Sequence, residues 1–318
     1  MFATISIQTY NHAETLARTL ESLRSLRCPR GIDYEILVVN NNSSDHTPQI
    51  IERYATILGP RLRSVFEGQQ GLSHARNRAL REARGEVLCF LDDDALADQN
   101  WLAGHLRVYQ RCANIVAVGG KIQLLWPKGQ SRPKWLSAHL DGYLTGLDLG
   151  SSSQLMRYPA YPYGCNMSVR RPMAEKVGGF CSRLGRKGSS LVSNEEKHFF
   201  YKIHLLEGHV IYAPKALVFH MVSLERLQKR FFLKRGYAQG ISDIVLQQET
   251  AKPDACGYYW LRQLVKGVNL AGHASARAMI DSIYRLDGAF SSLVRCVYGA
   301  GYSIGAAKTL AGFLKSAI

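Results

Sequence analysis

The chain has 318 residues, of which 46% are hydrophobic and 20% charged, so it has the composition of a globular protein and not of a disordered one. Its 40 Lys and Arg exceed its 25 Asp and Glu, and the net charge of +15 indicates an anionic partner: a nucleic acid, a membrane surface or a phosphate-bearing substrate. Its seven cysteines are scattered without a CxxC pair, which argues against a zinc site and for a reducing compartment.

The first hundred residues alternate between expected strands and helices. The strand segments are ATISIQTY (3–10), YEILVVN (34–40), LRSVFE (62–67) and EVLCFL (86–91). The expected helices are one capped by Asn11 with Glu14 in a capping box, one capped by Thr47 with Pro48 at its first position, and one over 73–85 that ends at Gly85. Strands joined by helical crossovers predict a parallel sheet that binds ligands at its carboxyl end.

Polar clusters follow three of these strands: Thr9 to Asn11, Asn40 to Asp45, and Asp92 to Asp94. Because parallel strands end at one edge of a sheet, we expect the clusters to converge on one site. Asp92 and Asp94 could hold a divalent cation that bridges two phosphates; a solvated turn is the alternative. The amides of Asn40, Asn41 and Asn42 could read a nucleobase edge, with Asp45 as a cap, but a plain turn explains them equally well.

The pattern becomes less regular after Trp101. Strands are expected over 114–126 and 210–220, the latter bent or split in two, and binding loops over the Gly-, Pro- and Ser-rich segment 126–165. A strand and a helix are expected over 164–180, and a helix over 194–208. From about Val222 the chain is expected to be helical, basic and amphipathic. We therefore predict one domain over 1–222, with halves at 1–100 and 101–222, and a C-terminal region over 223–318.

Several charged positions leave two interpretations open. Ser193-x-x-Glu196 matches a capping box, but Glu195 or Glu196 could instead face a cleft as a general base. His220, at the end of an apolar strand, is a boundary residue or a metal ligand. Arg76 and Arg78 are surface charges, or one of them reaches a phosphate or base. The segment RLQKRFFLKR (226–235) lies against anionic lipid or is a solvated face that covers core.

Five segments, in this order, resemble the family-two glycosyltransferases of the GT-A fold. These inverting enzymes include cellulose, chitin and hyaluronan synthases and many bacterial polysaccharide transferases. The segments are SIQTYNHAETLARTLESL, YEILVVNNNSSDHT, GLSHARNRALREARGEVLCFLDDDA, GCNMSVRRPMAEKVGGF and NEEKHFFYKIHLLEGHVIYAPKALVFH. The resemblance covers residues 1 to 222; beyond it, the tail is similar to those of bacterial exopolysaccharide transferases, though less specifically.

The resemblance implies a Rossmann-like α/β fold, with a mixed sheet flanked by helices and a basic helical C-terminal extension. It also implies a role for each matched residue. Thr9 and Asn41 match positions that contact a uracil-type base, and Asn41 stands where the family usually has Asp. The other residues implied on the nucleotide side are Tyr10, Asn11, Arg76, Asp92 and Asp93. Asp94, Asp92 and His220 would bind Mg²⁺ or Mn²⁺; Glu196 or Glu195 would be the base; and Gly164, Asn166 and Met167 would line the sugar and acceptor.

These roles imply an inverting transfer of a sugar from a nucleotide-diphosphate donor, UDP-linked in the first instance, to a hydroxyl of a glycan or lipid-linked acceptor in polysaccharide biosynthesis. With no signal peptide and no apolar run near the ~20 residues of a spanning helix, we expect a cytoplasmic protein peripheral to the inner face of the plasma membrane. Two alternatives are a sugar-nucleotide pyrophosphorylase and a nucleic-acid-binding protein. A pyrophosphorylase should have a Gly-rich loop at its N-terminus, and the segment SIQTYNHAE has no such loop. Because the basic residues are spread along the chain, we expect no nucleic-acid partner.

Overall fold

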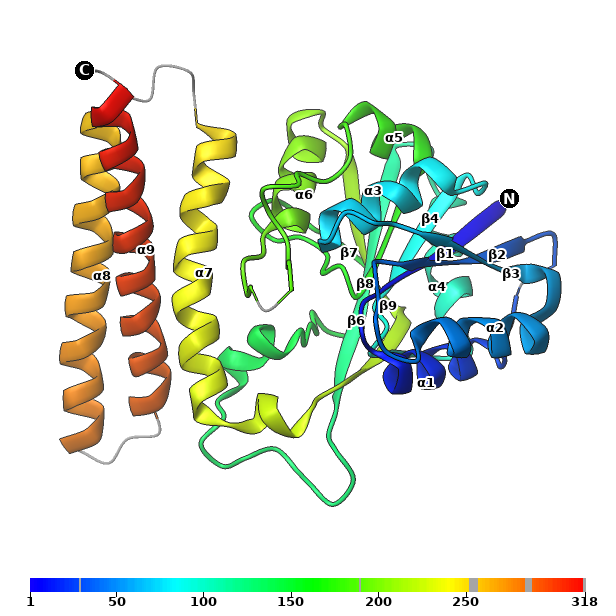
Figure 1. Cartoon of the computed structure of the whole chain (residues 1–318), viewed down its shortest axis with the longest axis horizontal. Helices are drawn as coiled ribbons and strands as arrows, with labels where there is room; N and C mark the ends of the chain where they lie inside the picture. Colours follow the sequence, from blue (N-terminus) through cyan, green and yellow to red (C-terminus); the bar gives the residue numbers. More distant parts are fainter. Residues whose placement is uncertain (29, 189, 252–256, 284–287, 317–318) are drawn as a thin grey trace. The chain divides into compact units, whose positions relative to one another are not determined.

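The computed structural model describes residues 1–28, 30–188, 190–251, 257–283 and 288–316 (Figure 1). The chain forms two compact units. The first comprises Met1–Leu125, Thr145–Ser182 and Glu195–Met221, and the second comprises Trp126–Leu144, Arg183–Asn194 and Val222–Ile318. The last segment of the second unit thus begins where the sequence predicts a C-terminal region. The two shorter segments of the second unit come from inside the stretch 101–222. A division of the sequence at a single residue cannot assign them to the second unit.

The first unit is built on one mixed sheet of nine strands, in the order β3-β2-β1-β4-β8-β6-β9-β5 with β7 paired to β9 (Figure 1). The strands are β1 (Phe2–Thr9), β2 (Asp33–Asn40), β3 (Leu62–Phe66), β4 (Val87–Leu91), β5 (Ala95–Ala97), β6 (Ile115–Leu125), β7 (Gln154–Leu155), β8 (Asn166–Arg170) and β9 (His209–Met221). Strands β3, β2, β1 and β4 are parallel, as the crossovers predict. Strand β8 runs antiparallel between β4 and β6. The predicted mixed α/β sheet is therefore confirmed.

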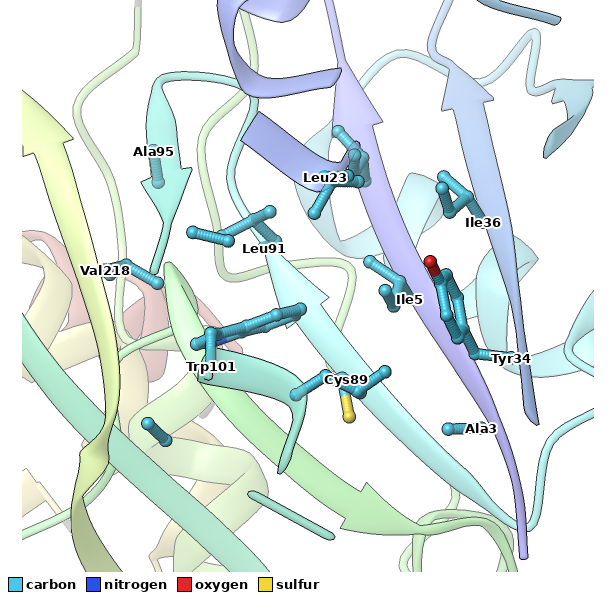
Figure 2. Packing of buried hydrophobic residues seen from close by; sticks show 14 of the residues in the cluster. Ala3, Ile5, Leu23, Tyr34, Ile36, Cys89, Leu91, Ala95, Trp101 and Val218 are labelled. Atoms are coloured by element: carbon cyan, nitrogen blue, oxygen red, sulfur yellow. The ribbon is translucent and has the colours of Figure 1, made fainter. Parts of the chain in front are cut away.

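Helices cover the sheet of this unit. They are α1 (Ala13–Leu23), α2 (Thr47–Leu58), α3 (Leu72–Glu82), α4 (Trp101–Tyr109), α5 (Arg171–Lys176) and α6 (Glu195–Leu205). Figure 2 shows Ile5, Ile36 and Leu91 of three adjacent strands packed with Leu23 of α1 and Trp101 of α4. Side chains on the opposite face, such as Leu37 and Val39, pack against α3. Burial on both faces explains why these strands are apolar without a break.

The helix starts differ from the predicted caps. Asn11 has a left-handed backbone (φ 53°), and its Oδ1 accepts a hydrogen bond from the N–H of Ser44 at 2.7 Å, so it does not cap α1. Asp45 does so instead, because its Oδ2 accepts from the N–H of Ala13 at 3.1 Å. The Oδ1 of Asp45 also accepts from the N–H of Thr47, the first residue of α2, at 3.0 Å. One carboxylate thus holds the starts of two helices, and the predicted caps at Asn11 and Thr47 are wrong.

Two other predicted boundaries also change. Helix α3 ends at Glu82, three residues before Gly85, and Gly85 instead lies directly against the backbone of β1. The segment 210–220 is a single strand, β9, whose pairing with β6 shifts register between Gly120 and Lys121. The bent-strand alternative is therefore the one that the structure adopts.

The described part of the second unit is mostly helical, with α7 (Lys229–Thr250), α8 (Gly257–Ile283) and α9 (Ala289–Ser316) following two short 3₁₀ segments, Ala138–Leu144 and Leu224–Leu227. Helix α9 packs against both α7 and α8 (Figure 1). The backbones approach closely, since a Cβ on Gly240 would overlap Tyr298 of α9, and one on Gly267 would overlap Ser303. The predicted helical character of the tail is confirmed for these residues.

The segment 226–235 adopts the second of its two interpretations. Phe232 is fully buried, and its ring packs edge-on against Trp135 and Phe290. The Nζ of Lys229 lies over the ring of Trp135 at 5.9 Å. Through Phe232 the segment therefore covers the core of its own unit. None of the described helices is long and apolar enough to cross a membrane.

The cysteines that the structure describes are all free thiols: Cys28, Cys89, Cys112, Cys165, Cys181 and Cys296. The seventh, Cys256, lies outside the described residues. The scattered spacing of the cysteines in the sequence is consistent with this lack of pairing.

Candidate active site

The three polar clusters meet at the carboxyl edge of the parallel strands, as predicted. The N–H of Asn41 donates to the carbonyl of Thr9 at 2.9 Å, which joins the ends of β1 and β2. The turn after β1 is tied to the turn after β4, because Nδ1 of His12 lies 3.0 Å from Oδ1 of Asp93. A site that no single motif could form is thus assembled from three turns of one unit.

The first part of the site consists of the aspartates that follow β4. After Asp94 the chain forms the short strand β5, in which Ala95 pairs with His220 of β9. This register brings Oδ1 of Asp94 within 3.3 Å of Nε2 of His220. Asp93 points instead toward His12, and Asp92 points toward Arg76, whose Nη2 is 3.7 Å from its Oδ1. The three neighbouring carboxylates therefore face three different partners.

Among the described residues, no group of three or more His, Cys, Asp or Glu side chains could hold a metal ion by itself. Asp94 and His220 nevertheless offer an oxygen and a nitrogen side by side, with the carboxylate of Asp92 two residues earlier. Mg²⁺ and similar cations commonly take one or two protein carboxylates and complete their coordination with phosphates and water. The donor set fits a divalent cation that a nucleotide diphosphate helps to hold.

The second part of the site is a buried cluster around Arg76 of α3. This side chain is 1% exposed, and its guanidinium lies over the ring of Phe180 at 5.4 Å. Its Nη1 contacts Oε1 of Glu195 at 2.9 Å and Oε1 of Glu196 at 3.1 Å. Together with the contact to Asp92, these pairs make Arg76 the link between the aspartates after β4 and the start of α6. It is not one of the surface charges that the sequence also allowed.

The two glutamates at the start of α6 differ in protonation. Burial, together with the charge of Glu196, raises the pKa of Glu195 to about 8, so that Glu195 carries a proton at neutral pH. Burial acts on Glu196 in the same sense, but the Arg76 guanidinium outweighs it and the pKa of Glu196 is lowered. Of the two candidate bases, Glu196 is the one that is ionised at neutral pH, as a base must be.

The Ser193–Glu196 capping box is not formed. The hydroxyl of Ser193 donates to Gln239 and accepts from Arg235, whereas Oε1 of Glu196 accepts from the N–H of Gly164 at 3.2 Å. The Glu196 carboxylate faces Gly164 and Arg76, and its role as a general base stays a prediction.

Burial also affects the aspartates. It raises the pKa of Asp92 to about 6, opposed by Arg76 and reinforced by the charges of Asp94 and Asp93. A cation beside these carboxylates would favour their ionised forms, which gives a physical reason for three acids in succession.

Gly164 lies against this cluster, and a substitution there tests its geometry. A Cβ at this position would overlap Nη2 of Arg76 and Oε1 of Glu196, and both side chains are held by the buried ion pairs. We expect Gly164→Ala to displace the Glu196 carboxylate and to lower the turnover number by about 100-fold, the usual effect of a misplacement near 1 Å. Gly272→Ala is the control, since a Cβ there meets nothing within 4 Å. Sugar-transfer kinetics of the two variants measure the effect, and equal turnover would contradict it.

The residues predicted to face the nucleoside lie at the ends of β1 and β2. The Thr9 hydroxyl is buried and makes no hydrogen bond with any described residue, and Tyr10 beside it is exposed. The Asn41 amide donates to the carbonyls of Glu67 and Gln69, at 3.0 and 2.7 Å, and its Oδ1 accepts from the N–H of Gly71. Asn41 thus holds the loop that leads into α3, and its contact with a base stays a prediction.

The predicted sugar-lining residues of β8 are buried inside the first unit. Oδ1 of Asn166 accepts from Nε1 of Trp101 and contacts Nε2 of His105, and its Nδ2 donates to the carbonyls of Lys121 and Ala216. Met167 lies in a hydrophobic cluster with Phe199 and Tyr212. Gly164 reaches the Arg76 cluster, but the side chains of Asn166 and Met167 are not accessible to a sugar here. Their direct contact with a sugar stays a prediction.

Several residues that organise the site carried no signal in the sequence. His12 lies between Asn11 and Glu14, the two residues of the expected capping box, and its ring contacts Asp93. His105 has its pKa lowered by burial to about 4, so it is neutral, and it joins Trp101 in fixing Asn166. Their partners lie 61 to 81 residues away along the chain. A polar residue on a helix gives no indication of so distant a partner.

Comparison with known proteins places the chain in a family. The model of Glycosyl transferase family 2 matches residues 4–177, which is more than half of the chain. The chain therefore belongs to glycosyltransferase family 2, and it is a glycosyltransferase. The resemblance seen in the sequence motifs is confirmed.

Relatives and structural neighbours agree with this assignment. The chain is 26% identical over 244 residues to the glucosyl-dolichyl phosphate glucuronosyltransferase of Haloferax volcanii, covering 76% of this chain and 75% of that protein. It is 26% identical over 237 residues to the succinoglycan biosynthesis protein ExoM of Rhizobium meliloti, covering 74% and 72%. The mannosyltransferase PcManGT from Pyrobaculum calidifontis, solved in complex with GDP-Man and Mn²⁺, superposes with a TM-score of 0.64 at 20% identity, over 97% of this chain and 86% of that one. The predicted GT-A fold is confirmed.

Proposed function

We infer that this glycosyltransferase moves a sugar from a UDP-sugar to a hydroxyl of a lipid-linked or growing glycan, with inversion at the anomeric carbon. One observation carries the proposal: the buried guanidinium of Arg76 joins Asp92, after β4, to Glu196, an ionised carboxylate at the start of α6. A donor whose phosphates lie beside the aspartates would present its anomeric carbon toward Glu196.

Glu196 serves as the general base. Its lowered pKa keeps it ionised at neutral pH, so that it can accept the proton of the acceptor hydroxyl as that oxygen attacks the anomeric carbon. The attack comes from the face opposite the departing diphosphate, and a single displacement inverts the configuration. The hydrogen bond from the N–H of Gly164 and the contact with Arg76 hold the carboxylate in one orientation. Glu195, which keeps its proton at neutral pH, contacts the same Nη1 of Arg76.

Asp92, Asp94 and His220 would hold the divalent cation. When bound, Mg²⁺ or Mn²⁺ supplies positive charge that stabilises the leaving diphosphate. PcManGT carries Mn²⁺ in its complex with GDP-Man, which supports the assignment of a divalent cation. The buried Thr9 hydroxyl, with no hydrogen-bond partner among the described residues, is a polar atom at the end of β1 that could bind the donor.

The acceptor and the place of action rest on the relatives. The Haloferax enzyme is named for a glucosyl-dolichyl phosphate acceptor and the Rhizobium protein for succinoglycan biosynthesis. A lipid-linked acceptor in polysaccharide assembly fits both names, and it favours a protein that works at the inner surface of a membrane. The net charge of +15 is consistent with this location.

Calorimetric titration with UDP, with and without Mn²⁺, tests the cation site. The wild-type chain is expected to bind UDP more tightly in the presence of Mn²⁺, and Asp94→Ala is expected to weaken that binding by about 100-fold, because a carboxylate ligand is lost. Glu52→Ala, on the exposed face of α2, is the matched control and should leave binding unchanged. If Asp94→Ala binds UDP with the same affinity and the same Mn²⁺ dependence as the wild type, the assignment is refuted.

A further inference from the structure

The outer face of α8 carries a continuous apolar stripe. Tyr258, Leu261, Val265, Val268 and Met279 are 45% to 67% exposed. Their spacings of three, four, three and eleven residues place them on one side of a helix with 3.6 residues per turn. The positions between Val268 and Met279 on this side are the exposed residues Gly272, Ser275 and Ala276. The stripe runs along the axis for about 32 Å, at 1.5 Å per residue.

The apolar stripe is bordered along one side by basic residues. Arg262, Lys266, His273 and Arg277 are all exposed and recur at intervals of four, seven and four residues. At 3.6 residues per turn these positions form a second stripe next to the first, on the same solvent-facing half of the helix. The buried face of α8, with Trp260, Gly267 and Ala274, lies on the opposite side. The exposed half of α8 is therefore amphipathic in its own right.

Helices α8 and α9 carry far more basic than acidic side chains. Helix α8 carries the cations Arg262, Lys266 and Arg277, and α9 carries Arg295, Lys308 and Lys315, which makes six Lys or Arg in all. Asp281 is the only acidic residue in the described parts of these two helices. It is buried, and it accepts from Ser292 and pairs with Arg277 at 2.9 Å. No acidic side chain on these two helices is exposed.

We propose that the outer face of α8 is a docking surface for an anionic lipid bilayer, with the apolar stripe inserted into the interface and Arg262 and Lys266 against the headgroups. A helix that has an apolar face, a basic polar face and too few apolar residues to span lies in the plane of the membrane. A second copy of the chain is a poorer occupant, because apposing two such faces would bring cations against cations. This assignment rests on the membrane location in the proposed function. It does not rest on the basic segment 226–235.

Co-sedimentation of the full chain with vesicles tests the proposal. Vesicles of phosphatidylcholine alone are compared with an equimolar mixture of phosphatidylcholine and phosphatidylglycerol. The wild type is expected to bind the anionic vesicles more tightly, and added salt is expected to weaken the binding. Arg262→Gln with Lys266→Gln should weaken the binding by about 30-fold, because two cations that each contribute to binding at a charged surface are lost. Val265→Ser with Val268→Ser should weaken it by about tenfold on both kinds of vesicle.

Leu205→Ser, on α6, is the matched control, since Leu205 is as exposed as the residues of the stripe but lies outside it. It should bind like the wild type. Vesicle binding by both double variants equal to that of the wild type would overturn the proposal. So would light scattering that shows a wild-type dimer and monomeric Val265→Ser/Val268→Ser, because a second copy would then occupy the face.

The same preparations separate this surface from the active site. Mn²⁺-dependent binding of UDP should be unchanged in both double variants, because the substituted side chains lie on α8 and not among the site residues. A chain that binds UDP but not anionic vesicles contradicts the docking surface alone. A chain that binds vesicles through α8 but shows no Mn²⁺-dependent UDP binding contradicts the proposed function alone.

Discussion

Replacing Glu196 by Gln is expected to lower the turnover number by about 10²- to 10⁴-fold, the range that a lost general base produces. UDP binding with Mn²⁺ should persist, because Gln keeps the size of the side chain and the aspartates are untouched. The amide cannot accept the acceptor proton, and it loses the charge that Arg76 stabilises. Sugar-transfer kinetics and calorimetric titration of the same protein measure the two effects.

Glu195→Gln is the matched variant, one residue away and of the same size. Because Glu195 is protonated at neutral pH, an amide resembles its natural state, and turnover should fall by less than about tenfold. In the wild type, raising the pH through about 8 ionises Glu195 and places a second negative charge beside Glu196, so activity should change there. That alkaline change should vanish in Glu195→Gln. Equal losses in both variants would show that the two carboxylates do not have separate roles.

Replacing Arg76 by Met is expected to destabilise the fold by about 3 to 5 kcal/mol, because removal of one partner leaves buried carboxylates without a counter-charge. The guanidinium is 1% exposed and contacts Glu195, Glu196 and Asp92. Arg78→Met, two residues along α3, is the control. Its partner is the half-exposed Glu82, and such surface pairs contribute at most about 1 kcal/mol. Urea unfolding of the three proteins gives the free energies.

The loss of unfolding free energy in Arg76→Met should depend on pH in a defined direction. The lowered pKa of Glu196 in the wild type contributes stability that is present above its unfolded value and is lost as the pH falls. Without Arg76 this carboxylate favours its protonated form, so the variant gains relative to the wild type as the pH falls toward 4. The difference between the two proteins should therefore be larger at pH 8 than at pH 5. A constant or reversed difference would show that the ion pairs are not what Arg76 contributes.

The parallel half of the fold could be predicted from sequence because its signals are local. Strands β1, β2 and β4 are buried on both faces and therefore read as unbroken apolar runs. The turns at their ends carried Thr9, Asn41 and Asp92, which the parallel arrangement brings together. Positions along a strand and the direction of the strand are enough for that inference.

The rest of the site depends on contacts that local patterns do not contain. Strand β8 enters between β4 and β6, and no feature of NMSVR indicates that position. The pair between Arg76 and Glu195 spans 119 residues, so the sequence allowed a surface charge or a phosphate contact for Arg76 but not this pairing. Asp45 illustrates the same limit, since its carboxylate caps α1 as well as the adjoining α2. Such pairings become visible only when the sheet has brought the turns together.

The buried guanidinium has a consequence for the order in which the reactants arrive. Asp92, Asp94 and the ionised Glu196 outnumber the cation of Arg76 among the described residues of the site, so the site is locally negative although the molecule as a whole is strongly basic. A bare pyrophosphate group approaching it meets repulsion. Free nucleotide should consequently be a poor competitor in a chelating buffer, and the donor should enter together with its own counter-ion.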